Sequence, residues 1–233
     1  MNRRSLLAGA AAAGTVGLAG CLGGLLSTTS RESTPAGVSE SVLAATEYEL
    51  AGVERRTTEQ TVEFAGQSET VTVTSYLTTY ERRVGIEGVA EAATATFAVF
   101  STPKIAVFGQ PLNPVAEQST RDLVGLVERE YDSIDNIDHE ADTTVTVLDQ
   151  QVTKSRFAAT TNVGGFPIDL DIHVTEAVDR DSDLVVTFAA YPRSFREIEA
   201  DNVTALAESV TADPPATNES VAGDPSNESA ADQ

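Results

Sequence analysis

The sequence predicts an α+β domain, a curved antiparallel sheet with two main helices packed on it. Most of the chain between residues 38 and 211 alternates apolar and polar residues, which is the period of half-buried strands. Two segments change to a spacing of three and four, typical of amphipathic helices. The predicted strands are joined by links of hairpin length. Because parallel crossovers need a helix between each pair of strands, we expect antiparallel pairing.

Eight strands and two helices are expected in order along this domain. The strands of the first half are residues 61–64, 70–77, 92–101 and 104–108. Those of the second half are residues 143–150, 152–161, 168–175 and 184–191, and Pro192 ends the last one. The first helix should start at Ser119, with Asp122 near its positive end, and run to Ile134. The second should start at Asp201 and present Val203, Leu206, Ala207 and Val210 on one side.

The N-terminus has the pattern of an exported lipoprotein. Arg3-Arg4 is a twin-arginine pair, and residues 6–19 are uncharged but too short and too weakly apolar to remain as a spanning helix. Two small residues precede Cys21, which is the only cysteine of the chain. We interpret residues 1–20 as a signal peptide and Cys21 as a lipidated residue that anchors the protein to the outer face of the cell membrane. The alternative is an uncleaved helix with an incidental cysteine.

Two further segments flank the domain of residues 38–211. Residues 21–37 are rich in Gly, Ser and Thr, so we expect a flexible stalk between lipid and domain. Residues 212–233 are acidic and contain almost nothing to bury, which predicts a disordered tail. The acceptor pattern for N-glycosylation occurs at Asn202, Asn218 and Asn227.

The charge of the chain limits its partners. Removal of Arg3 and Arg4 with the leader leaves 13 Lys and Arg against 36 Asp and Glu, a formal charge of −23. Lys104 and Lys154 are the only lysines. Such a surface repels itself at low salt, whereas molar salt shortens the Debye length to about 3 Å and screens the repulsion. We therefore expect a protein adapted to high salt. Nucleic acid is not an expected partner, since phosphate binding needs basic patches.

One predicted strand carries a candidate metal site. Asp169, Asp171 and His173 alternate, so their side chains share one face, with neighbours about 6.7 Å apart at the backbone. Carboxylates and an imidazole at this spacing could share a cation. The alternative, which we favour, is the solvated face of an amphipathic strand, and we assign no metal ligands.

Two other motifs give weaker evidence for a chemical function. Asp135, Asp138, His139 and Asp142 form an acidic cluster, but it lacks the glycine turn and terminal Glu of a calcium loop. We expect a solvated loop there, in which His139 would be a general base without an identifiable nucleophile. Residues 101–104 match Ser-x-x-Lys, but the companion motifs of that enzyme class are absent from the sequence. The sequence thus predicts no catalytic residues.

Several stretches carry a resemblance to a known family. With the leader, VSESVLAATEYELAGVE, VTVTSYLTTYER, FAVFSTPKIAVFGQPLNPVA and VVTFAAYP resemble a haloarchaeal lipoprotein family of unknown function. The resemblance implies export and surface anchoring in a salt-loving archaeon, and it implies no activity. The order of strands and helices is similar to the PsbP-like α/β/α sandwich, a likeness of topology that transfers no function.

Together these features favour a membrane-anchored, non-enzymatic binding or accessory module. It would need no cofactor, and it would meet the membrane through the lipid on Cys21 and a protein partner at the cell surface. One alternative is a metal-dependent extracellular enzyme that uses Asp169, Asp171 and His173. Another is the solute receptor of a transporter, although a single domain lacks the two lobes that usually close around a solute.

Overall fold

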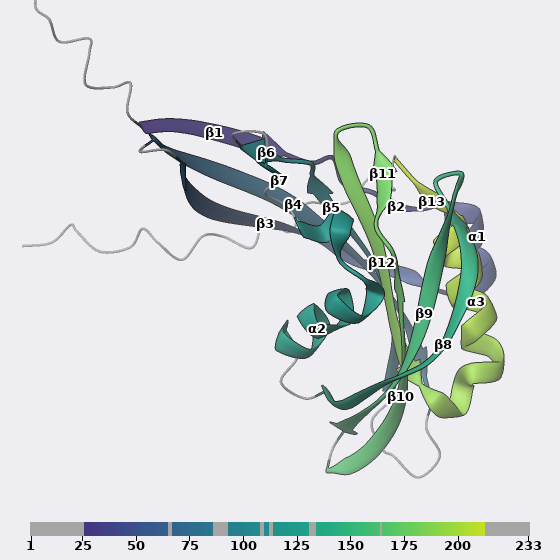
Figure 1. Ribbon diagram of the computed structural model, residues 1–233. Coiled ribbons are helices and arrows are strands. Elements are labelled where there is room, and N and C mark those ends of the chain that lie inside the picture. Colours follow the sequence, from purple (N-terminus) through teal and green to yellow (C-terminus); the bar gives the residue numbers. More distant parts are fainter. Residues whose placement is uncertain are drawn as a thin grey trace, which may run out of the picture.

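The computed structural model describes residues 26–64, 67–85, 93–107, 110–111, 114–130, 134–163 and 165–212 (Figure 1). Its helices are α1 (Glu40–Thr46), α2 (Thr120–Glu130) and α3 (Arg196–Glu208), with 3-10 turns η1 (Pro114–Glu117) and η2 (Arg193–Phe195). Its strands are β1 (Leu26–Glu32), β2 (Gly37–Val38), β3 (Glu49–Phe64), β4 (Gln67–Val84), β5 (Ala93–Pro103), β6 (Ala106–Val107), β7 (Gln110–Pro111), β8 (Ile134–Val147), β9 (Gln150–Val163), β10 (Phe166–Thr175), β11 (Val178–Arg180), β12 (Asp183–Pro192) and β13 (Val210–Thr211).

A large open sheet organises these elements. Its strands run in the order β3-β4-β5-β12-β10-β9-β8, and each neighbouring pair in this series is antiparallel. β11 pairs with β12, and β1 lies parallel to the part of β4 that β5 does not reach. β2 pairs with β13 and β6 with β7 in two small separate sheets.

Helices cover both faces of this sheet (Figure 1). α1 and α3 pack on one face, and the apolar core there includes Tyr80, Phe97, Val185, Ala189, Val203 and Leu206. α2 packs on the other face, where the core includes Leu123, Val124, Phe157, Ile172, Leu184 and Val186. Successive residues of β12 therefore pack alternately into the two cores, because successive side chains of a strand point to opposite faces. Because the helices lie on both sides, β12 and most of β10 are buried on both faces.

The predicted fold class is confirmed in its coarse form, with one correction. The described residues are mostly strand, with few helices, and α2 and α3 lie near the two predicted helices. The expectation of a purely antiparallel sheet is wrong, because β1 pairs in parallel with β4, from Leu26 opposite Ser68 to Glu32 opposite Thr74. The connection from β1 to β4 is not a hairpin. It contains α1 and β3, so parallel pairing is geometrically allowed.

Several element boundaries also differ from the prediction. α3 begins at Arg196, so Asp201 lies inside the helix instead of at its start. The 3-10 turn after Pro192 leads directly into the helix, and Phe195 at the N-cap makes no side-chain capping hydrogen bond. The predicted N-terminal pair of α2 is present, since Ser119 donates from N and Oγ to the Asp122 carboxylate at 3.1 and 2.7 Å. The expected acidic loop at residues 135–142 is part of β8.

The outer parts of three strands form an arm that projects from the body of the molecule (Figure 1). We define the arm as β1 with residues 57–64 of β3 and 67–74 of β4, which pair side by side. Val71 of the arm is fully buried and packs with Ile105, which follows β5. The expected flexible stalk of residues 21–37 is thus wrong for residues 26–32. These Ser- and Thr-rich residues complete the arm as a strand.

Candidate functional site

The three residues of the predicted site on β10 differ in how far they are buried. Asp169 is exposed, whereas Asp171 and His173 are 0% and 5% exposed and lie between the sheet and α3. The expectation of a solvated face is therefore wrong for Asp171 and His173. β10 is paired on one side with β9 and, from Leu170 onward, on the other with β12, and α3 covers the face on which these two side chains lie.

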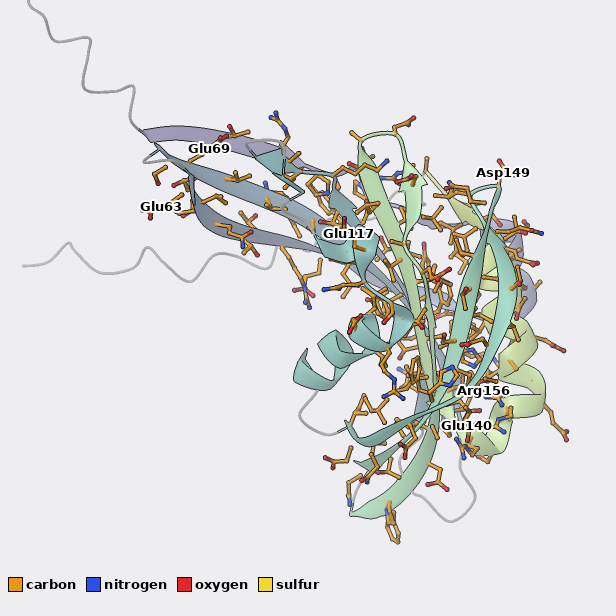
Figure 2. All side chains as sticks on the ribbon, in the orientation of Figure 1. Glu63, Glu69, Glu117, Glu140, Asp149 and Arg156 are labelled. Carbon is orange, nitrogen blue, oxygen red and sulfur yellow. The ribbon has the colours of Figure 1, made fainter. Side chains whose placement is uncertain are left out.

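Asp171 is held by arginines from the start of α3. Arg193 Nε donates to Oδ1 at 3.0 Å, Arg196 Nη2 donates to Oδ1 at 2.6 Å, and Arg196 Nε donates to Oδ2. Glu140 of β8 accepts hydrogen bonds from both arginines and from Arg156 (Figure 2). Burial alone would raise the pKa of Asp171. Hydrogen bonds and charge from Arg196 and Arg193 outweigh burial, so the pKa lies below its ordinary value. Asp171 is a structural anion with both oxygens engaged.

His173 is neutral and stacked against a tyrosine. Its Nε2 lies 2.8 Å from the Tyr191 hydroxyl oxygen, and the ring centroids are 5.4 Å apart. Burial, and then the charge of Lys154, lowers the pKa of His173 to about 3. Its Nδ1 is buried and has no hydrogen-bond partner in the part of the chain that the structure describes. Among those residues, no group of three or more His, Cys, Asp or Glu side chains could hold a metal ion.

A second buried carboxylate, on Glu199, was not among the predicted site residues. Glu199 of α3 is 0% exposed and accepts hydrogen bonds from Tyr48 Oη at 2.8 Å and from Arg82 Nη1. Arg82 also donates to Glu47, at the end of α1, at 2.9 Å. These contacts tie α3 to α1 and β4. No local pattern could predict them, because Tyr48 and Glu199 are 151 residues apart in the chain.

The remaining predicted motifs do not assemble into catalytic groups. His139 Nε2 and Ser155 Oγ both contact Oδ1 of Asp142, at 2.7 and 2.6 Å, so the carboxylate separates the imidazole from the buried hydroxyl. Ser101 is fully buried and donates to the Thr34 carbonyl, while Lys104 pairs with Asp179 at 2.7 Å. The Ser-x-x-Lys match therefore brings no amine to its serine.

A clamp fixes the chain where it passes from the arm into the body. The backbone N–H of Thr34 donates to Asp183 Oδ2 at 2.8 Å, and its carbonyl accepts from Arg180 and from Ser101 Oγ. Arg180 pairs with Asp183 at 2.9 Å, and the two side chains are 10% and 6% exposed. Ser33 Oγ donates to the Ser101 carbonyl at 2.9 Å. Residues 33–36 are therefore part of the folded domain and not of a free linker.

The arm is the end of the molecule at which the described chain begins. Leu26 is opposite Ser68, which is in turn opposite Glu63 near the end of β3. Figure 2 shows Glu63 and Glu69 on the arm, far from Asp149 and Arg156 on the body. Cys21, Asn218 and Asn227 lie outside the described residues. Asn202 lies within α3, half-buried, and its Nδ2 donates to Glu199 at 3.4 Å.

These features define an α+β domain with an open mixed sheet, a projecting arm and an internal polar layer. Residues 35–211 match the model of a domain of unknown function, DUF6517, so the chain belongs to that family. No curated protein shows significant similarity to the sequence. One solved structure that the chain matches is that of PA94 from Pseudomonas aeruginosa, a protein of unknown function described as a putative regulator. It is 9% identical, covers 63% of this chain and 94% of its own, and has a TM-score of 0.30.

In the described residues, each helix is too short or too polar to span a bilayer.

Proposed function

We propose that this protein is a lipid-anchored module on the outer face of the membrane of a halophilic archaeon, and that it binds a partner or supports a membrane complex without catalysis. The twin-arginine leader and Cys21 support export and lipidation, and the charge of −23 supports a high-salt setting. A sheet with helices on both faces is also the layering of the PsbP-like sandwich that the topology resembles. That likeness carries no function.

The observation that carries the proposal is the place where the chain enters the domain. Cys21 lies five residues before Leu26, which stands at the arm tip, so the lipid would be within about 17 Å of that tip. β1 adds seven paired residues, or about 20 Å of strand, between the tip and the clamp at Thr34. An anchor at Cys21 would therefore hold the membrane at the arm and present the body to the outside.

The metal-enzyme alternative has less support. It needs Asp169, Asp171 and His173 to share an ion, but both oxygens of Asp171 accept from arginines and His173 Nε2 contacts Tyr191. Only Asp169 of the three is exposed. A bound cation would also lie beside Arg193 and Arg196, whose charges repel it.

Cell fractionation in a haloarchaeal host tests the anchor. The natural chain should sediment with membranes, and Cys21→Ser should appear in the medium or accumulate as an unprocessed precursor. Replacing Arg3 and Arg4 with lysine, which preserves charge and leaves Cys21 intact, should retain the protein inside the cell. Tight membrane association of the Cys21→Ser protein would defeat the lipoprotein proposal.

A further inference from the structure

β3 is a long edge strand whose outer side is open. It pairs with β4 over Glu49–Phe64, and within the described residues no other strand pairs with it. From Gly52 to Phe64 the register with β4 is unbroken, and the stretch contains no proline. An edge strand presents a row of unpaired backbone N–H and C=O groups, which is a template for a further strand.

The opposite edge of the sheet is built differently. The register of β8 with β9 shifts between Asp135 and Asp138 and again between His139 and Ala141. Such irregularities interrupt the regular spacing that a new strand would need. α3 also packs against β8 (Figure 1). In the described residues β1 also pairs on one side only, but it is seven residues long, so the longest regular edge available for pairing is that of β3.

The charges along β3 are complementary to a second copy of the same strand. Two copies related by a two-fold axis perpendicular to the sheet pair antiparallel, and opposite residues must point to the same face. The axis must then pass through one residue position. With the axis at Thr57, Arg55 of each copy lies opposite Glu59 of the other. An axis at Arg56 puts like charges opposite each other, and an axis at Thr58 brings no charges together. Axes at Arg55 or Glu59 also form two opposite-charge pairs, but they place that residue opposite its own copy, so only the axis at Thr57 forms opposite-charge pairs without a like-charge pair.

The side chains concerned are accessible. Glu59 is exposed and makes no ion pair in the described part of the chain. The Arg55 side chain is 57% exposed, and its contact with Glu32 is long, at 3.5 Å. Glu32 lies on β1, on the far side of β4 from β3, so Arg55 would leave this exposed contact to pair with Glu59 of a second copy, an exchange that costs little because exposed ion pairs are weak. We infer that this protein forms a two-fold dimer in which residues 52–62 of β3 pair antiparallel about Thr57.

Sedimentation velocity over a concentration series tests the pairing. The protein used is the chain from residue 21 with Cys21→Ser, which keeps every described residue and does not depend on lipidation. Arg55→Glu and Glu59→Arg should each raise the dimer dissociation constant about tenfold or more, since each puts two like-charge pairs opposite one another. The double variant Arg55→Glu/Glu59→Arg should restore the natural constant.

Glu63→Arg is the matched control, because it makes the same charge change as Glu59→Arg at a position just beyond the paired residues 52–62. It should dimerise like the natural chain. Melting curves check that each variant remains folded. A monomer at every concentration would overturn the inference. The open edge of β3 would then be a site for an extended segment of another protein. A dimer that neither single variant weakens, or that Glu63→Arg weakens equally, would also overturn it.

Discussion

Replacing Asp171 with asparagine should destabilise the domain strongly, although position 171 lies on the face that the sequence suggested was solvated. The substitution preserves shape but removes the charge that Arg193 and Arg196 contact. It tests whether the polar layer beneath α3 stabilises the fold, and it separates a buried ion pair from a surface one.

The size of the expected loss in stability depends on how exposed the two arginines that contact Asp171 are. Removing one member of a buried ion pair costs about 3–5 kcal/mol, because the other charge is left without compensation. Here Asp171 is fully buried, but the arginine side chains are 33% and 34% exposed and keep Glu140 as a partner. Water and Glu140 compensate in part, so we expect a loss of about 2–3 kcal/mol. For a chain of this length that lowers the melting temperature by about 4–12 °C.

Thermal melts followed by circular dichroism measure the effect, with Asp169→Asn as the matched control. Asp169 lies two residues earlier on β10 and is exposed, so its substitution should change stability by less than about 0.5 kcal/mol. The pKa of Asp171 is lowered in the folded state, so its contribution is present above the unfolded value near 3.9 and lost as pH falls through the folded value. The difference between the variants should therefore shrink below about pH 4. Equal melting temperatures for both variants at pH 7 would refute the reasoning.

Three further predictions follow from burial, charge and the clamp. Because the pKa of His173 is about 3 when folded, the unfolded chain takes up the proton first as pH falls below 6.5, so stability should drop by about 2 kcal/mol between pH 6.5 and 5. His173→Gln should lack this drop, and a parallel drop in both proteins would contradict the assignment. The chain from residue 21 with Cys21→Ser should melt at a temperature that rises with KCl up to about 1 M, where repulsion among carboxylates is screened, and a flat series would exclude adaptation to salt. Arg180→Ala should accelerate amide hydrogen exchange in residues 26–34, and unchanged exchange would show that the clamp does not hold β1.

Local pattern was sufficient for two strands of the second half. The predicted strands 168–175 and 184–191 are β10 and β12 to within two residues at each end. Alternation marks a strand wherever the strand lies in a sheet, so these predictions did not depend on knowing the neighbours. In the first half β3 and β4 are far longer than the predicted strands 61–64 and 70–77. Thr, Glu and Arg side chains line both faces of β3, and their sequence does not alternate.

The burial of Asp171 and His173 could not be read from β10 itself. The alternation of residues 168–174 shows that one face is apolar, but not that a helix covers the other. That helix starts more than twenty residues later and brings Arg193 and Arg196 to the carboxylate. The stalk prediction failed for a similar reason. Ser- and Thr-rich sequence suits both linkers and strands, and β4, the partner that makes β1 a strand, is about forty residues away.

The proposed lipid on Cys21 would hold the protein at the tip of the arm. Once Cys21 carries a lipid, a cysteine introduced elsewhere is the only free thiol, so a fluorophore can be placed at one position. We choose Glu63→Cys at the arm tip and Gln151→Cys, an exposed position beside Asp149 on the body (Figure 2). Quenching by headgroup-labelled lipid in vesicles that carry the lipidated protein should be strong at position 63 and weak at position 151. Equal quenching at the two positions, or stronger quenching at 151, would contradict the account.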